Sequence, residues 1–162
     1  MAVIDTSVLI HLCRVGNLEI LKKFFKKIAI TQEVYDELQE GKIGFSEVEK
    51  GKNEWIRIQN PKEKEKIKQT SKLENIEEAD ASIILLAKER KDILLSNDYA
   101  LIRIARSKNI ECWWLTTFLL KCLEKNVLTK KDAKELLLEL IESGMRLSNV
   151  VYAAILKEIE TM

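Results

Sequence analysis

The sequence has very few residues that interrupt regular structure, with one proline and five glycines in 162 residues. This composition favours a helix-rich domain with short loops, and it excludes collagen-like and glycine-rich or proline-rich disordered chains. Net charge is also nearly absent, at +1 at pH 7. Overall charge therefore does not draw nucleic acid to this molecule, and any such contact needs a local basic patch.

Soft metal ligands are scarce as well. The sequence has one histidine, His11, and three cysteines, Cys13, Cys112 and Cys122, none of them in a C-x-x-C pair. These are too few ligands for a zinc site. The odd number of cysteines and the absence of a basic, apolar leader at the start predict a reducing compartment, so we expect a cytoplasmic protein. No apolar run approaches the length of a membrane span, and no membrane contact is expected.

Short apolar runs alternate with helical patterns along the first 115 residues. The runs predict strands at residues 2–4, 27–30, 55–58, 93–96 and 110–115. Helices are predicted at residues 7–13, 18–26, 32–39, 76–90, 99–108 and 117–124, and two more begin after caps at Thr129 and Ser148. Gly41 and Gly44 predict a break. This alternation predicts an α/β protein with a parallel sheet of about five strands, covered by helices on both faces.

The sequence indicates a single domain and contains one segment of biased composition. With no internal repeat or domain-length linker, we predict a single domain over residues 1–162. It consists of an α/β core over 1–115 and a helical extension over 116–162. Residues 62–72 are rich in lysine and glutamate, which favours a solvated helix or connector. The alternative is a phosphate-attracting edge near an active site.

Acidic residues follow two of the predicted strands. Asp5 comes immediately after the strand 2–4, and Asp98 follows the strand 93–96 after one residue. Parallel strands end at the same edge of a sheet, which we call the carboxyl rim. Because ligands of such folds bind beyond this edge, both carboxylates are candidates for a functional site.

Two further acids lie on predicted helices. Glu37 follows Val34 by three residues, and Asp80 precedes Ile83 by three. This spacing puts Asp80 on the apolar stripe of its helix, where an unpaired carboxylate is costly. A hard divalent cation would compensate several such carboxylates, orient a phosphodiester and activate water. No nucleophilic side chain is needed, and the sequence has no Ser-His-Asp set, P-loop or G-x-G-x-x-G motif.

Each acid also has a purely structural interpretation. Asp5 and Asp98 stand where they could cap the helices that follow them, since Asp is a favoured N-cap. Glu37 could be an ordinary surface residue of an amphipathic helix. Glu78 stands three residues after Asn75, which is the spacing of a capping box. The residues alone leave these interpretations open.

The four acidic segments together resemble the motifs of PIN domains, in order and spacing. Residues 3–10 (VIDTSVLI) resemble the opening strand with its Asp, and residues 31–38 (TQEVYDEL) resemble the second motif with its Glu. Residues 78–87 (EADASIILLA) look like the third motif, and residues 94–101 (LLSNDYAL) resemble the fourth. The C-terminal helices, including residues 144–148, look like the extension of an archaeal and bacterial subgroup.

This resemblance implies an RNase H-like three-layer α/β/α sandwich and a metal-dependent ribonuclease. Mg²⁺ or Mn²⁺ would be held by the four residues that are also catalytic, Asp5, Glu37, Asp80 and Asp98. Metal-activated water would hydrolyse RNA phosphodiester bonds. Many small PIN proteins are VapC-type toxins, so a partner antitoxin protein and a homodimer are also expected.

The resemblance also implies supporting residues around the four acids. Thr6, Ser7 and Ser96 would orient ligands or water, together with Asn97. Glu78 would be an accessory acid. The sequence departs from the family pattern at two places. Glu77 stands where many relatives have glycine, and no second acid stands beside or shortly after Asp98.

Two rival functions remain at this level. A haloacid-dehalogenase-type phosphatase also has an Asp after its first strand, but it needs a second acid two residues later, where this chain has Ser7. A non-catalytic PIN scaffold that binds RNA or a partner protein is the other alternative. No RNA-recognition module in the sequence decides between RNA and DNA as substrate.

Overall fold

The computed structural model describes all 162 residues and contains one sheet of five parallel strands. The order of the strands across the sheet is β3-β2-β1-β4-β5. Their bounds are β1 (Ala2–Ile4), β2 (Ile28–Ile30), β3 (Ile56–Ile58), β4 (Ile93–Leu95) and β5 (Cys112–Trp113). The predicted α/β class and the five-stranded parallel sheet are confirmed.

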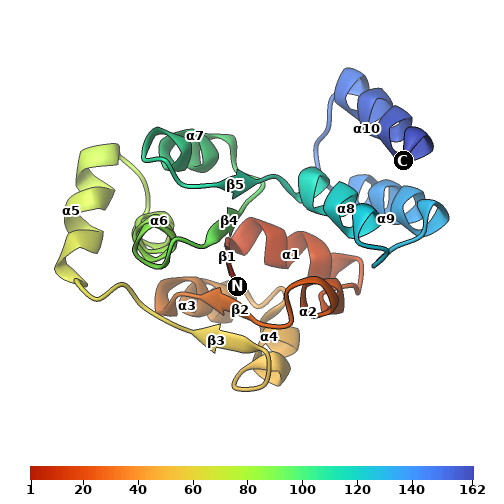
Figure 1. The fold of residues 1–162 in the computed structure, drawn as a ribbon. Helices are drawn as coiled ribbons and strands as arrows, with labels where there is room; N and C mark the ends of the chain where they lie inside the picture. Colours follow the sequence, from red (N-terminus) through yellow and green to blue (C-terminus); the bar gives the residue numbers. More distant parts are fainter.

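Helices cover both faces of this sheet. The first five are α1 (Thr6–Arg14), α2 (Glu19–Phe25), α3 (Gln32–Gly41), α4 (Phe45–Gly51) and α5 (Glu65–Glu74). The others are α6 (Glu78–Arg90), α7 (Tyr99–Ser107), α8 (Leu115–Glu124), α9 (Lys130–Glu142) and α10 (Asn149–Thr161). Figure 1 shows α1 and α2 on one side of the strands and α5 and α6 on the other. The predicted three-layer arrangement is therefore also confirmed.

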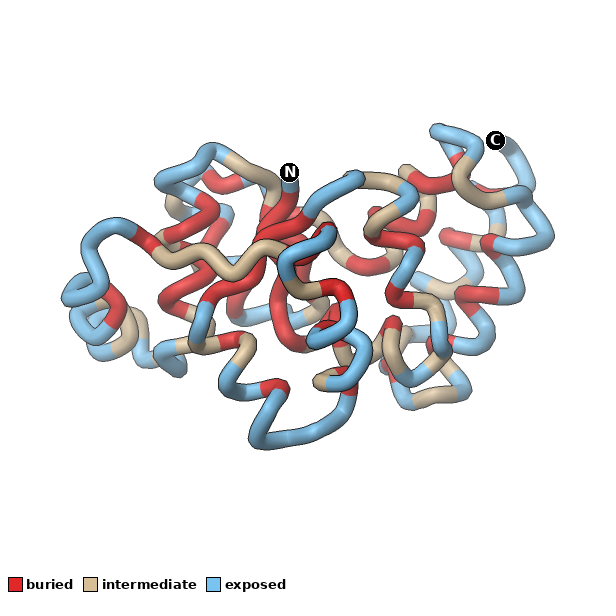
Figure 2. The backbone as a smooth tube through the Cα atoms, turned by 90° about the horizontal axis from the view of Figure 1, so that it is seen from below, coloured by how far each residue is buried: buried red, intermediate tan, exposed pale blue.

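The central strands are apolar because both of their faces are buried. Every residue of β1 and β2 is buried, and Val3 pairs with Ala29 on one side and Leu94 on the other. Figure 2 shows the buried residues concentrated along the strands and the inner faces of the helices. Fully burying one such Ile or Leu side chain contributes about 1.5–3 kcal/mol, so the sheet and its helices form a firm scaffold.

The strand order reverses between β1 and β4. The chain proceeds from β1 outward through β2 to β3, and then returns to β4 on the other side of β1. The amide of Asp5 donates to the carbonyl of Leu95 (2.9 Å), which extends the pairing of the two strands to their ends. A crevice at the carboxyl ends of β1 and β4 follows from this reversal, and it is where ligands bind in open α/β sheets.

The C-terminal helices α8, α9 and α10 pack on one another, and α9 also contacts α1. Leu136 of α9 and Ile155 of α10 belong to the same buried cluster as the strand residues. The single domain and its boundary at residue 115 stay predictions. None of the ten helices combines the length and apolar character needed to cross a membrane.

Three local predictions were wrong. The glycine-marked break contains a helix, α4, which begins after Gly44 in a left-handed conformation (φ 81°). The last strand is only Cys112–Trp113, because Trp114 already forms the N-cap of α8. Asn75 does not begin a capping box: it ends α5 in a left-handed conformation (φ 55°), and Glu77 is the N-cap of α6. The predicted caps at Thr31, Thr129 and Ser148 are confirmed.

The lysine-rich segment forms α5 and packs on α6. Its start lies beside the end of α6, where the amide of Lys62 donates to the Glu89 carboxylate (2.9 Å). Its end, at Asn75, reaches the carboxyl rim. The lysines at the start of this segment are therefore not grouped around the rim.

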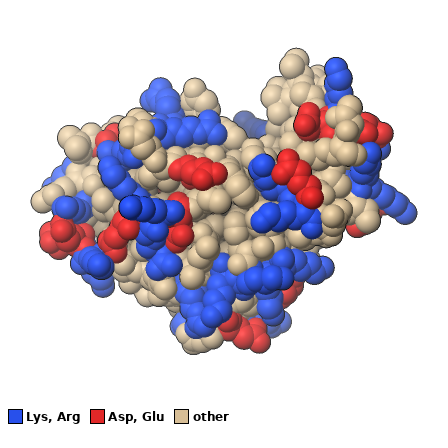
Figure 3. All heavy atoms as spheres, in the orientation of Figure 1, with Lys and Arg blue, Asp and Glu red and all other residues tan.

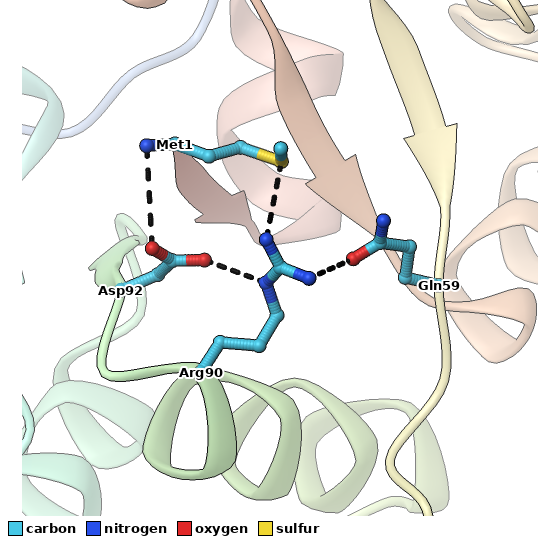
Figure 4. A network of polar contacts seen from close by, with 4 residues as sticks. All are labelled: Met1, Gln59, Arg90 and Asp92. Atoms are coloured by element: carbon cyan, nitrogen blue, oxygen red, sulfur yellow. Dashed lines mark hydrogen bonds and ion pairs between the residues drawn. The ribbon is translucent and has the colours of Figure 1, made fainter.

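A polar network ties the beginning of β1 to the end of α6 (Figure 4). Arg90 contacts Asp92 (2.7 Å), donates to Gln59 and lies 3.8 Å from the sulfur of Met1. The N-terminal amine is 4.0 Å from Asp92. On the face shown in Figure 3, Lys and Arg side chains are spread over the surface with acids between some of them.

Candidate active site

A hollow at the carboxyl rim brings the four predicted acids together. Asp5 and Asp98 follow β1 and β4, while Glu37 and Asp80 lie on α3 and α6. The residues that line this hollow, here called the acidic hollow, are Asp5, Thr6, Ser7, Ile10, Glu37, Asn75, Ile76, Glu77, Asp80 and Asp98. Four segments that are far apart in the sequence therefore contribute one acid each to a single surface.

Asp5 is the most buried of these acids, with 5% of its surface exposed. Its Oδ2 accepts hydrogen bonds from the hydroxyls of Ser7 (2.7 Å) and Ser96 (2.8 Å). Although Asp5 occupies the N-cap position of α1, its side chain makes no capping hydrogen bond. The capping interpretation of Asp5 is therefore wrong. Burial raises the pKa of this carboxyl, and the two serine hydroxyls oppose that rise.

The two serine hydroxyls are themselves fixed by the backbone. Ser7 Oγ accepts from the amide of Asn97 (3.0 Å), and Ser96 Oγ accepts from the amide of Asp98 (3.0 Å). Because each hydroxyl accepts from an amide, its single proton is directed to Asp5. Asn97 thus contributes its backbone N–H to this network. The arrangement joins the ends of β1 and β4 and holds the Asp5 side chain in one orientation.

Asp98 combines a structural contact with an available oxygen. Its Oδ1 accepts from the amide of Leu101 (3.1 Å), so Asp98 caps α7 as the structural interpretation proposed. Its Oδ2 makes no hydrogen bond or ion pair with the protein. Capping and a role in the acidic hollow are therefore compatible, because each uses a different oxygen of the same carboxylate.

Glu37 is held by the first residue of α1. The hydroxyl of Thr6 donates to Glu37 Oε2 (2.9 Å). Burial raises the pKa of Glu37; the Thr6 hydrogen bond lowers it, and the neighbouring charges of Asp5, Glu77 and Glu40 raise it further. Glu37 is an exposed residue, but its hydrogen bond with Thr6 and its position beside other acids of the rim are compatible with a role in the hollow.

A buried hydroxyl pair joins the helices that carry Glu37 and Asp80. Thr31 and Ser82 are both fully buried, and their oxygens are 2.7 Å apart. Ser82 donates to the carbonyl of Ala79 (2.6 Å). The proton of the Thr31 hydroxyl therefore goes to Ser82, while its oxygen accepts the capping bond from Val34 (3.3 Å). This pair fixes the start of α3 against the first turns of α6.

The pKa of Asp80 is affected by every other acid that lines the hollow. Burial, followed by the charges of Asp5, Asp98, Glu77 and Glu37, raises the pKa of Asp80 to about 7. None of the ion pairs in the structure involves any of the four predicted acids. The acidic hollow therefore holds several carboxylates close together without any basic side chain to compensate them.

The two neighbouring glutamates before Asp80 differ from expectation. Glu78, the predicted accessory acid, is exposed and does not line the hollow. Glu77 lines it instead, and its charge raises the pKa values of Asp80 and Glu37. The signal for Glu77 was its position three residues before Asp80, on the same side of the helix start. Many members of the family have glycine at this position, so the resemblance does not imply an acid there.

The donor set of the hollow fits a hard divalent cation, since it consists of carboxylate and hydroxyl oxygens. In the structure as it stands, no group of three or more acidic, cysteine or histidine side chains is arranged so that it could hold a metal ion. A cation would therefore need these side chains to move toward one another. Its charge would favour such movements, because it would replace their mutual repulsion with attraction.

Comparison with known proteins identifies the family and supports the fold. A family model described as DUF3368, PIN domain, matches residues 1–161. Among solved structures, the crystal structure of PAE2754 from Pyrobaculum aerophilum superimposes with a TM-score of 0.54 and is 16% identical. The match covers 74% of this chain and 94% of that one, and at this identity it supports the fold alone. A search of curated proteins found no match.

Proposed function

The chain belongs to the PIN-domain family, and on that premise we propose that it is a divalent-metal-dependent ribonuclease. PIN domains are nuclease-type folds. The observation that carries the proposal is the convergence of Asp5, Glu37, Asp80 and Asp98 on one hollow at the carboxyl rim, where burial and the neighbouring acids raise the pKa of Asp80 to about 7. Such repulsion is costly for a merely structural surface, and it is what a site for a dication has before the ion binds.

The residues proposed to hold Mg²⁺ or Mn²⁺ are Asp5, Glu37, Asp80 and Asp98. When bound, the ion would supply positive charge for the phosphodiester and an activated water. The protein itself orients the ligands: Ser7 and Ser96 hold Asp5, and Thr6 holds Glu37. Fixed ligands lower the cost of organising the site, and loss of such supporting contacts typically weakens metal binding 10- to 100-fold.

The experiment that tests this proposal is cleavage of a labelled single-stranded RNA pool with Mn²⁺, Mg²⁺ or EDTA. The unmodified protein is compared with Asp5→Asn and Asp98→Asn, and exposed Glu78→Gln is the matched control. Metal-dependent cutting that is lost in both Asp variants and kept in Glu78→Gln supports the proposal. Absence of cutting by folded protein that also binds no Mn²⁺ contradicts it.

The second candidate is a non-catalytic PIN scaffold that binds RNA or a partner protein. The observation in its favour is that the acids do not stand in a closed ligand set. Binding of RNA without cleavage, unchanged by Mn²⁺ and by Asp5→Asn, would favour this function over the nuclease.

Finer details of the proposal come from the family resemblance. We infer that the protein is a VapC-like toxin, acts on RNA in the cytoplasm, is neutralised by an antitoxin protein and forms a homodimer. Val150 and Val151 on α10 are exposed, which offers one apolar surface for a protein partner. Light scattering measures the oligomeric state, and co-expression with the product of a neighbouring gene tests for an antitoxin.

A further inference from the structure

Two aromatic side chains stack at the carboxyl rim, beyond the residues that line the acidic hollow. The rings of Tyr99 and Trp114 have centroids 6.4 Å apart and planes inclined by 27°. Tyr99 is 69% exposed, whereas Trp114 is half-buried and packs against the core. Trp114 therefore supports the Tyr99 ring on one side in an offset stack, and most of the Tyr99 side chain is open to solvent.

The topology places this pair beside the proposed catalytic residues. Tyr99 is the first residue of α7 and follows Asp98 directly, so their Cα atoms are about 3.8 Å apart. Trp114 follows β5, the neighbour of β4, and is the N-cap of α8. Both aromatic residues thus stand where parallel strands end, on the same rim as the four acids.

The fold gives no structural reason for an exposed aromatic side chain at position 99. Tyr35, in contrast, packs against Phe45 and donates its hydroxyl to Glu49. The Tyr99 hydroxyl makes no hydrogen bond with the protein, and the ring is the most exposed aromatic side chain among the large apolar groups of the surface. An exposed ring supported from below by a second ring is the arrangement that stacks a nucleobase.

An arginine side chain without a partner in the protein lies on the same face of α7 as Tyr99. Arg103 follows Tyr99 by four residues, which places the two side chains one above the other on the helix. Arg103 is exposed, and none of the ion pairs or hydrogen bonds of the structure involves its side chain. Arg106 of the same helix, by comparison, donates to the carbonyl of Cys112 (3.4 Å). Arg103 is therefore available for a phosphate group.

We propose that Tyr99, supported by Trp114, stacks an unpaired nucleobase next to the phosphodiester that the acidic hollow receives. Arg103 contacts the phosphate that follows along the strand. This inference rests on the proposed nuclease function and specifies its substrate, which must be single-stranded where it enters the site. A paired base cannot offer its face to Tyr99 because it is covered by its neighbours in the duplex.

The test measures binding of a labelled single-stranded oligonucleotide by fluorescence anisotropy, in EDTA so that metal-dependent cleavage does not interfere. Tyr99→Ala is expected to weaken binding about 5- to 150-fold, the range for loss of one base–aromatic stack. Tyr99→Phe keeps the aromatic face and should bind like the unmodified protein. Leu138→Ala, which removes another exposed apolar side chain, on helix α9, is the matched control and should have no effect.

Two further substrates separate stacking from charge. Placing an abasic nucleotide at successive positions should remove the difference between the unmodified protein and Tyr99→Ala at one position only. A duplex of the same sequence should bind both proteins equally. The inference is overturned if Tyr99→Ala binds the single strand as tightly as the unmodified protein does. Because binding is measured without catalysis, it can fail while metal-dependent cleavage by the unmodified protein still supports the proposed function.

Discussion

The hydroxyl of Ser96 donates to Oδ2 of Asp5 across 2.8 Å, although the two residues are 91 positions apart in the sequence. This contact joins the ends of β4 and β1 at the point where the strand order reverses. It also depends on the backbone, since Ser96 accepts from the amide of Asp98 at the same time. One hydroxyl therefore positions two of the four acids relative to each other.

Ser96→Ala should weaken both metal binding and stability. Loss of the hydroxyl leaves Asp5 with one side-chain donor, Ser7, and leaves the amide of Asp98 without an acceptor. We expect Mn²⁺ affinity to fall about 10- to 100-fold and the free energy of unfolding to fall by about 1–3 kcal/mol. Calorimetric titration and urea denaturation measure the two effects. Ser107→Ala, which removes a hydroxyl that bonds only within α7, should change neither.

The raised pKa of Asp80 predicts an unusual pH dependence of stability. Its folded-state pKa is about 7, above the ordinary value of 3.8, so between these values the folded protein binds more protons than the unfolded chain. Stability therefore decreases as the pH rises from about 4 to about 7. Measured in EDTA, Tm should fall over this window in the unmodified protein. The fall should be smaller in Asp80→Asn, which carries no titrating group there.

Asp132 provides a contrast of opposite sign for the same measurement. It belongs to the capping box of α9, and its hydrogen bonds with Thr129 lower its pKa. Its contribution to stability is present above the ordinary pKa of 3.8 and is lost as the pH falls through the lowered value. Asp132→Asn should therefore leave the decline between pH 4 and 7 unchanged. If both Asn variants altered that decline equally, the acidic hollow would not be its source.

The buried hydroxyl pair predicts coupling between α3 and α6. Thr31→Val removes the cap of α3 and the bond to Ser82, and we expect a loss of about 1–3 kcal/mol in the free energy of unfolding. Ser82→Ala removes the other partner. A double-mutant cycle in urea should show that the two losses do not add, because both remove the same contact. Additive losses would mean that the pair does not hold the helices together.

The sequence predicted the elements whose local pattern agrees with their final environment. The strand 2–4 and the acid after it are predictable because a short apolar run followed by an acid indicates a buried strand that ends at a rim. Asp80 is predictable because a carboxylate on the apolar stripe of a helix is costly unless something compensates its charge. In each case, the local residues and the tertiary fold favour the same structure.

Other features depend on contacts that no local pattern contains. Asn75 has the spacing of a capping box before α6, yet it adopts the left-handed conformation that ends α5, because α5 must turn to pack on α6. Glu77 reaches the acidic hollow only through that same turn. The hydrogen bonds of Ser7 and Ser96 with Asp5 likewise require the two strands to be neighbours. The resemblance suggested these serines as supporting residues, and their catalytic importance stays a prediction.

Asp98 allows the structural and the catalytic role of one carboxylate to be separated. Its Oδ1 caps α7, while Oδ2 makes no contact with the protein. Asp98→Asn keeps an oxygen for the cap, since Asn is as good an N-cap as Asp, but it loses the negative charge that a metal ion requires. Asp98→Ala loses both. We therefore expect both variants to lose metal-dependent cleavage, and only Asp98→Ala to lose about 1 kcal/mol of stability.

Cleavage assays and urea denaturation of the two Asp98 variants measure these effects side by side. If Asp98→Asn were as unstable as Asp98→Ala, the cap would depend on charge rather than on the acceptor oxygen. If Asp98→Asn retained full cleavage, the free Oδ2 would have no part in catalysis and Asp98 would be a cap alone. The two oxygens of this residue thus decide between the interpretations that the sequence left open.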